Sequence, residues 1–165
     1  MSTLGYPDKH FVNAALGWLD LHTAAEARAE LLQISSANAA HPEALEVWWR
    51  VHAAELHWDE ALRVAELELI AAPDRMSGWV DRSYSLHELR RTQEAREALL
   101  PAVKKFPEAS LIPYNLACYA CQLGDSTEAQ HWLRKAIARG ERDEIKRLAL
   151  HDPDLATLRE EILKL

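Results

Sequence analysis

The sequence has few of the residues that mark several common protein classes. Its 165 residues include only 5 glycines, 7 prolines and 2 cysteines, which excludes collagen-like chains, most low-complexity disordered chains and disulfide-rich secreted domains. No apolar run approaches the roughly 18 residues of a membrane-spanning helix, and the N-terminal segment lacks the basic and apolar regions of a signal peptide. We therefore expect a cytoplasmic protein with no membrane partner.

Basic residues are in deficit. Lysine and arginine total 19 against 26 aspartates and glutamates, so the formal net charge is −7. A nucleic-acid-binding domain normally carries a basic face, and we expect no nucleic-acid partner. Hydrophobic residues make up 48% of the chain, which is enough for a hydrophobic core.

The dipeptide Glu-Ala recurs at a fixed spacing. Four of its copies, each 34 residues after the last, lie at residues 26–27, 60–61, 94–95 and 128–129. In the same frame, apolar segments end at Leu21, Leu89 and Leu123, and Pro73 and Pro107 close the second and third copies. A period of 34 residues with two helical segments per copy indicates a helical repeat protein.

This pattern resembles the tetratricopeptide repeat (TPR). The fourth copy matches the family's packing positions best, with Leu116, Ala117, Ala129, Leu133 and Ala136. The resemblance implies an all-α fold, a right-handed α-solenoid of antiparallel helix pairs with a C-terminal capping helix. It divides a single domain, 1–165, into units 8–41, 42–75, 76–109 and 110–143 and a cap at 144–165. The tail of the chain is similar to tails that follow such arrays in bacterial proteins.

Turn residues predict several helix ends. Thr23, three residues before a glutamate, is placed to open a helix with a capping box. Asp125 offers a second cap after Gly124, which can adopt the left-handed conformation. Asp152, followed by proline, is placed to cap the last helix. Pro101 either kinks or ends the helix in which it lies.

Motifs for catalysis are missing. The sequence has no glycine-rich phosphate loop, and no histidine stands at a motif spacing from a nucleophile. We therefore expect no enzyme, no catalytic residue, no cofactor and no metal. An alternative is a metal- or redox-linked protein that uses Cys118 and Cys121, with His87 brought near by a neighbouring helix. Buried structural cysteines are the simpler interpretation.

Six tryptophans could form a ligand cage. Trp18, Trp48, Trp58 and Trp79 fall at unit positions that the repeat fills with large apolar groups, so we expect them in the core. Trp132 is expected to be partly exposed and is the better candidate for a contact with another chain.

The resemblance also implies a ligand groove along the first helix of each unit. Carried over by unit position, the candidate residues are Asn13, Glu46, Arg50, Asp81, Tyr84, His87, Tyr114, Asn115, Cys118 and Gln122. The positions at which some family members hold acidic chaperone tails carry no matching basic and amide clamp here. Because the middle of the groove is acidic, we expect a neutral or basic protein or peptide segment as the ligand.

The sequence therefore predicts a non-enzymatic protein–protein interaction module, a scaffold or adaptor. A secretion-type chaperone is an alternative within the same class. The oligomeric state is left open.

Overall fold

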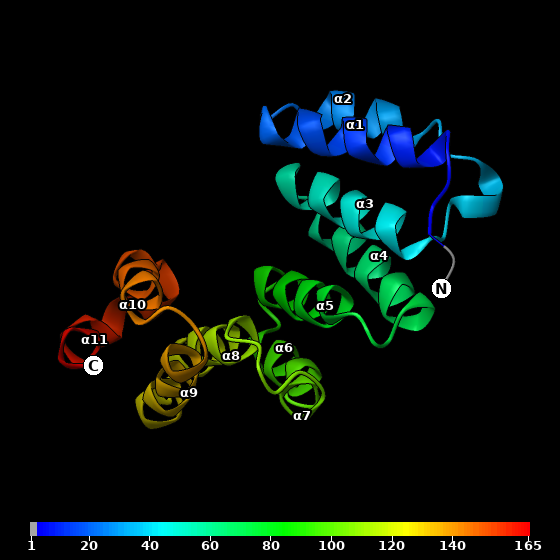
Figure 1. The fold of residues 1–165 in the computed structure, drawn as a ribbon. Coiled ribbons are helices and arrows are strands. Elements are labelled where there is room, and N and C mark those ends of the chain that lie inside the picture. Colours follow the sequence, from blue (N-terminus) through cyan, green and yellow to red (C-terminus); the bar gives the residue numbers. More distant parts are fainter. Residues whose placement is uncertain (1–2) are drawn as a thin grey trace. The chain divides into compact units, whose positions relative to one another are not determined.

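The computed structural model describes residues 3–165, and every regular element in that range is a helix (Figure 1). The chain forms two compact units, one through Ser85 and one from Leu86 to Leu165, with the boundary inside α5. We refer to them as the N-terminal and C-terminal units. Every helix among the described residues is too short or too polar to cross a lipid bilayer.

The N-terminal unit contains two helix pairs and most of a fifth α-helix. In chain order the elements are α1 (Asp8–Asp20), α2 (Ala24–Leu31), the short 3-10 helix η1 (Ser36–Asn38), α3 (Pro42–Ala54), α4 (Trp58–Ala71) and α5 (Met76–Glu88). Helix α1 packs on α2 and α3, and α3 packs on α4.

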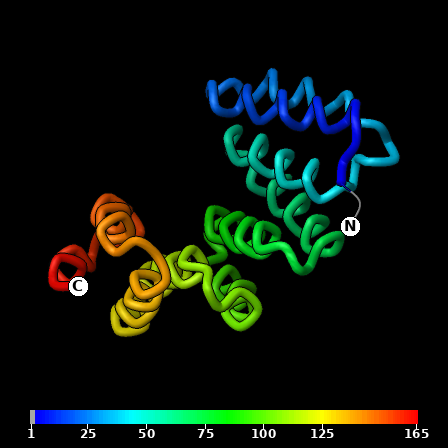
Figure 2. The backbone as a smooth tube through the Cα atoms, in the orientation of Figure 1, coloured from blue at the N-terminus to red at the C-terminus, as the bar shows by residue number. Residues whose placement is uncertain are grey.

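The C-terminal unit continues with a broken helix and a third close pair. Its elements are α6 (Thr92–Leu99), α7 (Ala102–Lys105), α8 (Leu111–Gln122), α9 (Ser126–Arg139), α10 (Arg142–His151), the 3-10 helix η2 (Pro153–Leu158) and α11 (Arg159–Lys164). Helix α8 packs on α9, on α6 and on η2. The tube in Figure 2 follows these elements from green to red.

A repeated backbone turn joins the helices. The residues with positive φ are His22, Leu56, Arg90 and Gly124, spaced 34 apart, with φ of 58°, 58°, 63° and 86°. In each turn the next amide donates to the carbonyl five residues earlier, for example His57 to His52 at 2.9 Å and Asp125 to Ala120 at 2.9 Å. This bond, with left-handed backbone at the preceding residue, is typical of the Schellman motif, which terminates a helix and turns the chain.

The recurring alanines lie in the core. Ala27, Ala61, Ala95 and Ala129 are all fully buried, so each of these helices approaches its neighbour through a residue without a long side chain. Trp49 of α3 instead carries a large side chain, and its indole Nε1 donates to Ser85 Oγ of α5 at 2.9 Å.

Helix ends follow the sequence predictions in part. Asp125 accepts a hydrogen bond from the Glu128 amide at 2.8 Å, which confirms that cap. The prediction of a capping box at Thr23 is wrong. The Thr23 side chain makes no cap hydrogen bond, and its hydroxyl donates instead to the Trp18 carbonyl at 2.8 Å. That carbonyl lies in the last turn of α1, where carbonyls lack intrahelical donors.

Pro101 interrupts the helix in which it lies. Helix α6 ends at Leu99 and α7 begins at Ala102, while Pro101 itself keeps helical angles of φ −60° and ψ −30°. Proline has no amide hydrogen for the preceding turn, so the two short helices continue in the same direction without a regular ladder of hydrogen bonds.

The end of the chain contains more helix than expected. Helix α10 precedes the predicted cap, and Asp152 then accepts from the Asp154 amide at 2.9 Å, as predicted. The segment that it opens is the 3-10 helix η2, not an α-helix, and α11 follows. The apolar side chains of η2 and α11 are buried, namely Leu155, Leu158 and Ile162.

Candidate functional site

The predicted groove residues divide evenly between the two units, and each half is described by itself. The N-terminal unit contains Asn13, Glu46, Arg50, Asp81 and Tyr84, and the C-terminal unit contains His87, Tyr114, Asn115, Cys118 and Gln122. The use of these residues as a ligand groove stays a prediction.

A surface depression of about 440 Å³ lies on the N-terminal unit. Its lining comes from α1, from α3 and from the residue before α5: Lys9, Val12, Leu16, Glu43, Glu46, Val47, Arg50 and Arg75. Val12 and Val47 are buried and form part of an apolar floor. The depression therefore combines an apolar floor with a charged rim.

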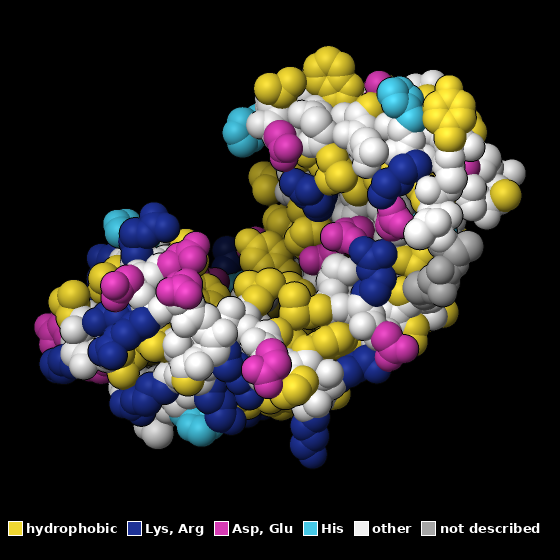
Figure 3. Space-filling view, viewed as in Figure 1, with side chains coloured by type: hydrophobic (Ala, Val, Ile, Leu, Met, Phe, Trp, Pro, Cys, Tyr) yellow, Lys and Arg dark blue, Asp and Glu magenta, His cyan; other side chains and the backbone are white. Residues whose placement is uncertain are grey.

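The charges on this rim compensate one another. Lys9 pairs with Glu43, and Arg75 pairs with Glu46. Arg50 is exposed and lies 3.7 Å from Asp20 in a loose surface pair. Figure 3 shows acidic and basic side chains side by side over α1 and α3. The rim is thus mixed in sign, which differs from the acidic groove that the sequence suggests.

Asp81 is buried and belongs to a carboxylate cluster with Glu46 and Glu68. Burial, followed by the charges of Glu68 and Glu46, raises the pKa of Asp81 to about 8, and Arg50 offsets this only in part. At neutral pH this carboxyl is therefore mostly protonated and adds little negative charge. Glu68 is fully buried, accepts from the Ser77 hydroxyl through Oε1, and has no partner for Oε2 among residues 3–165.

Tyr84 and Asn13 lie apart from the depression's lining. Tyr84 is 37% exposed, and its ring centroid lies 6.2 Å from that of Trp49 and 5.7 Å from that of Trp58. Asn13 is exposed on α1. The structure therefore brings together Glu46, Arg50 and Asp81 and leaves the other two at separate places.

In the C-terminal unit, four of the five predicted groove residues contact Asp152, which joins α10 to η2, or Asp154 in η2. Tyr114 donates its hydroxyl to Asp152 Oδ2 at 2.8 Å, and Cys118 Sγ lies 3.6 Å from the same oxygen. His87 Nε2 lies 3.0 Å from Asp154 Oδ2. Gln122 Nε2 donates to the Asp154 carbonyl at 3.0 Å. Asn115, the fifth, is buried.

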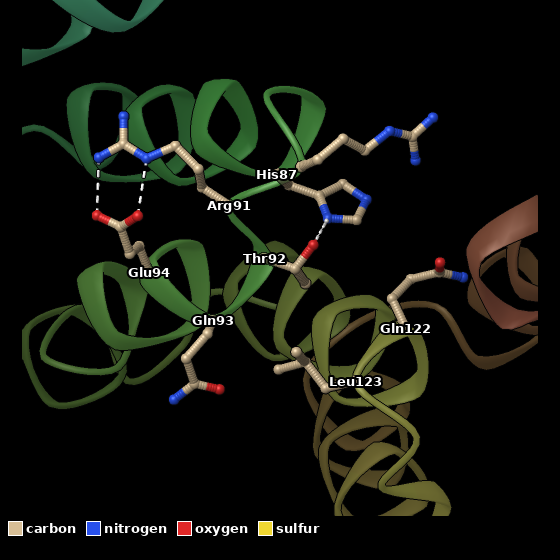
Figure 4. Close-up of a pocket in the computed structure, with 8 residues that line it drawn as sticks. His87, Arg91, Thr92, Gln93, Glu94, Gln122 and Leu123 are labelled. Carbon is tan, nitrogen blue, oxygen red and sulfur yellow. Dashed lines mark hydrogen bonds and ion pairs between the residues drawn. The ribbon is translucent and has the colours of Figure 1, made fainter.

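The other nitrogen of His87 is also bonded. Its Nδ1 lies 3.0 Å from Thr92 Oγ1, beside a depression of about 360 Å³ where Arg91 and Glu94 form a two-bond ion pair (Figure 4). With both ring nitrogens engaged, His87 joins the α5–α6 turn to the C-terminal segment.

Sequence reasoning missed this covering segment. Asp152 follows Cys118 by 34 residues, which equals the repeat period, and Asp154 follows His87 by 67. The repeated residue pattern ends at residue 143, however, so it does not predict that the chain returns here after α10. The available signal is the Asp-Pro-Asp sequence, which by itself indicates only a helix cap.

The two cysteines are unpaired and buried. Burial, together with the Asp152 and Asp154 carboxylates, raises the pKa of the Cys118 thiol well above its usual range, so it stays protonated and is a poor nucleophile. Cys121 Sγ lies 3.1 Å from Thr157 Oγ1.

Several solved structures superpose on this chain over most of its length. PilF of Pseudomonas aeruginosa superposes with a TM-score of 0.78 at 19% identity, over 95% of this chain and 69% of that one. A thermophilic TPR protein of Thermus thermophilus superposes with a TM-score of 0.74 at 18% identity, over 96% of this chain and all of that one. The chain has the tetratricopeptide-repeat fold.

A fragment of MamA from Desulfovibrio magneticus RS-1 is also similar to this TPR chain, with a TM-score of 0.71 at 17% identity over 99% of this chain and 97% of that one. No protein-family model matches the sequence, and no curated protein matches it. The predicted fold class, an all-α TPR fold of helix pairs, is confirmed, and these neighbours come from bacteria. Likeness at this level of identity shows the fold alone.

Within the TPR fold, the tryptophans differ from two predictions. Trp132 is buried: its indole donates to Glu128 Oε1 at 2.9 Å, and Lys135 Nζ lies 4.3 Å from its ring centroid. The prediction of an exposed contact residue is therefore wrong. Trp18, expected in the core, is 37% exposed, and its indole Nε1 donates to Glu30 Oε1 on α2 at 3.5 Å.

Two groups of side chains could hold a metal ion among the described residues. One is Cys118 with Asp152 and Asp154, and the other is His52 with Glu55 and His57 at the TPR turn between α3 and α4. In each group the ligand atoms all lie within 4.8 Å of one another. The first group is bonded within the C-terminal unit, as described above.

Proposed function

We propose that this TPR chain is a non-enzymatic protein-interaction module that binds a segment of a partner protein in the depression formed by α1 and α3. The observation that carries the proposal is the contrast between the two units. In the C-terminal unit, His87, Tyr114, Cys118 and Gln122 already contact the chain's own segment 152–154. In the N-terminal unit the corresponding face is an open depression.

The chemistry of the depression favours an extended segment without net charge. The sequence predicts a neutral or basic ligand, and the depression favours the neutral one. The apolar floor can take a side chain of the ligand, while the rim offers donors and acceptors for its backbone. Glu43 and Glu46 are already neutralised by Lys9 and Arg75. Because Arg50 is exposed and only loosely paired, it is the group most available to a ligand carbonyl or carboxylate.

Several sequence predictions remain part of this proposal. The absence of enzymatic activity, the exclusion of nucleic acid and the cytoplasmic location rest on composition and motifs. The raised pKa of the Cys118 thiol gives no support to the redox alternative. A secretion-type chaperone would use the same surface and stays an alternative prediction.

The test is a peptide array with neutral, basic and acidic sets of matched length. Wild-type protein should bind the neutral peptides best, and Arg50→Glu, which changes an exposed residue at the rim, should reduce that binding at least tenfold. Arg63→Glu is the matched control, because Arg63 is exposed on α4 and lies outside the lining. Preferential binding of acidic peptides, or an equal loss in both variants, would contradict the proposal.

A further inference from the structure

The turn between α3 and α4 gathers two histidines and a glutamate. His52 lies in the last turn of α3, Glu55 caps that helix, and His57 precedes α4. One ligand atom from each lies within 4.8 Å of the other two, and His57 Nδ1 is 3.2 Å from Glu55 Oε2. The amide of His57 donates to the carbonyl of His52 at 2.9 Å, so the turn itself holds the two histidines near each other.

The repeat does not require these residue types at these positions. The residues 34 apart in the other units, in the order of His52, Glu55 and His57, are Trp18, Leu21 and Thr23; Leu86, Leu89 and Arg91; and Ala120, Leu123 and Asp125. All four turns share the same left-handed residue and the same closing hydrogen bond. The three side chains are therefore specific to the second unit and not demanded by its fold.

His52 is prepared to act as a ligand. Its ring stacks on Trp48, with centroids 5.7 Å apart and planes at 25°. Its Nδ1 is buried and has no hydrogen-bond partner among residues 3–165. An imidazole nitrogen without a proton offers a lone pair, as a metal ligand must.

The Glu55 carboxylate is held in place by Arg28. Arg28 Nε donates to Glu55 Oε1 at 3.2 Å, and its Nη2 pairs with Oε2. A ligating carboxylate fixed by an outer hydrogen bond is a common feature of metal sites. Glu60, which is paired with Arg63, lines the same depression of about 340 Å³.

We propose that His52, Glu55 and His57 bind a divalent transition-metal ion, with Zn²⁺ as the first candidate. Two imidazoles and one carboxylate form a donor set that suits zinc and leaves a fourth position for water. Because His57 is exposed, this fourth position faces solvent. The ion would give the unpartnered ring of His52 a bond and would join α3 to α4 across their turn.

The second group of potential ligands is a weaker candidate. Asp152 accepts from Tyr114 and from Cys118, and Asp154 is bonded to His87, so these atoms already satisfy one another. The raised pKa of the Cys118 thiol also opposes the thiolate that a metal needs. The experiment nevertheless has to separate the two groups.

The test is calorimetric titration of the purified protein with Zn²⁺, with the metal content measured after dialysis. Wild type should bind one ion, and His57→Ala should weaken that binding at least tenfold. His57 makes no side-chain cap bond and is exposed, so this variant should fold normally. His22→Ala and His131→Ala change exposed histidines elsewhere and should bind as wild type does.

Two further variants make the result decisive. Cys118→Ser should leave zinc binding unchanged, and His52→Gln should weaken it as His57→Ala does. Added Zn²⁺ should raise the melting temperature of wild type and of Cys118→Ser but not of His57→Ala. Wild type that binds no zinc, equal binding by wild type and His57→Ala, or loss of binding only in Cys118→Ser would each overturn the proposal.

Discussion

His87 Nε2 and Asp154 Oδ2 lie 3.0 Å apart although 67 residues separate them in the sequence. His87 is almost fully buried, and Asp154 lies in the segment that closes the C-terminal unit. The bond joins the end of α5 to η2 and places the chain's own aspartates where the sequence predicts a ligand. This relationship turns the expected groove of the C-terminal unit into part of its interior.

Removal of the Asp154 carboxylate should loosen the covering segment. In Asp154→Ala the bond to His87 is lost, at a cost of about 1.5 kcal/mol for a partly buried charged hydrogen bond. Local opening over Cys118 and Cys121 should then increase about tenfold, measured as the rate at which a thiol reagent modifies them. Asp143→Ala, at an exposed position on α10, serves as the control. Unchanged modification rates in Asp154→Ala would show that this bond does not hold the segment.

Asp81 should make stability fall as the pH rises. Its pKa is about 8 in the folded chain, against about 4 for an unfolded aspartate. Between these values the folded state binds more protons, so the free energy of unfolding decreases as the pH increases from about 4 to 8. Urea unfolding at pH 5, 6, 7 and 8 measures this slope.

Asp81→Asn should flatten that slope and raise the stability at pH 8 by an amount on the order of 1–3 kcal/mol. Glu68, whose pKa burial also raises, should leave a smaller residual slope in the same direction. Asp59→Asn, at an exposed position on α4, should behave as wild type does. A slope that survives unchanged in Asp81→Asn would assign it to other groups.

The turn residues should respond oppositely to glycine and alanine. Arg90 has φ 63°, a conformation that strains side-chain-bearing residues, so Arg90→Gly should stabilise the protein by about 0.5–1 kcal/mol. Gly124 has φ 86°, and Gly124→Ala should destabilise it by about 1 kcal/mol. Chemical denaturation of both variants gives the comparison. Two shifts of the same sign would show that the left-handed backbone is not the controlling factor.

The recurring buried alanines should not tolerate replacement by a larger residue. Ala61 is fully buried, and Ala61→Leu should cost about 1–3 kcal/mol through overpacking between neighbouring helices. Ala25→Leu makes the same change at an exposed position on α2 and should alter stability by less than about 0.5 kcal/mol. Thermal unfolding distinguishes them, and equal effects at the two sites would argue against tight packing at the repeated alanine.

The sequence alone determined the helix pairs and their period of 34 residues. Helix formation and the small residues at the helix contacts depend on local spacing, which recurs in every unit and is therefore readable from the chain. The cap at Asp125 and the left-handed Gly124 follow from single residues with strong preferences. The same turns at His22, Leu56 and Arg90 carry no glycine, so only their backbone reveals them.

The tertiary structure decided which of the predicted residues meet. The chain's return after α10 brings Asp152 to Tyr114 and Asp154 to His87, and no local pattern encodes the direction of that return. Ion pairs likewise neutralise a rim that the groove positions carried over from the repeat predict to be acidic. Period and secondary structure are properties of neighbours in sequence, whereas charge, burial and ligand geometry at a site depend on neighbours in space.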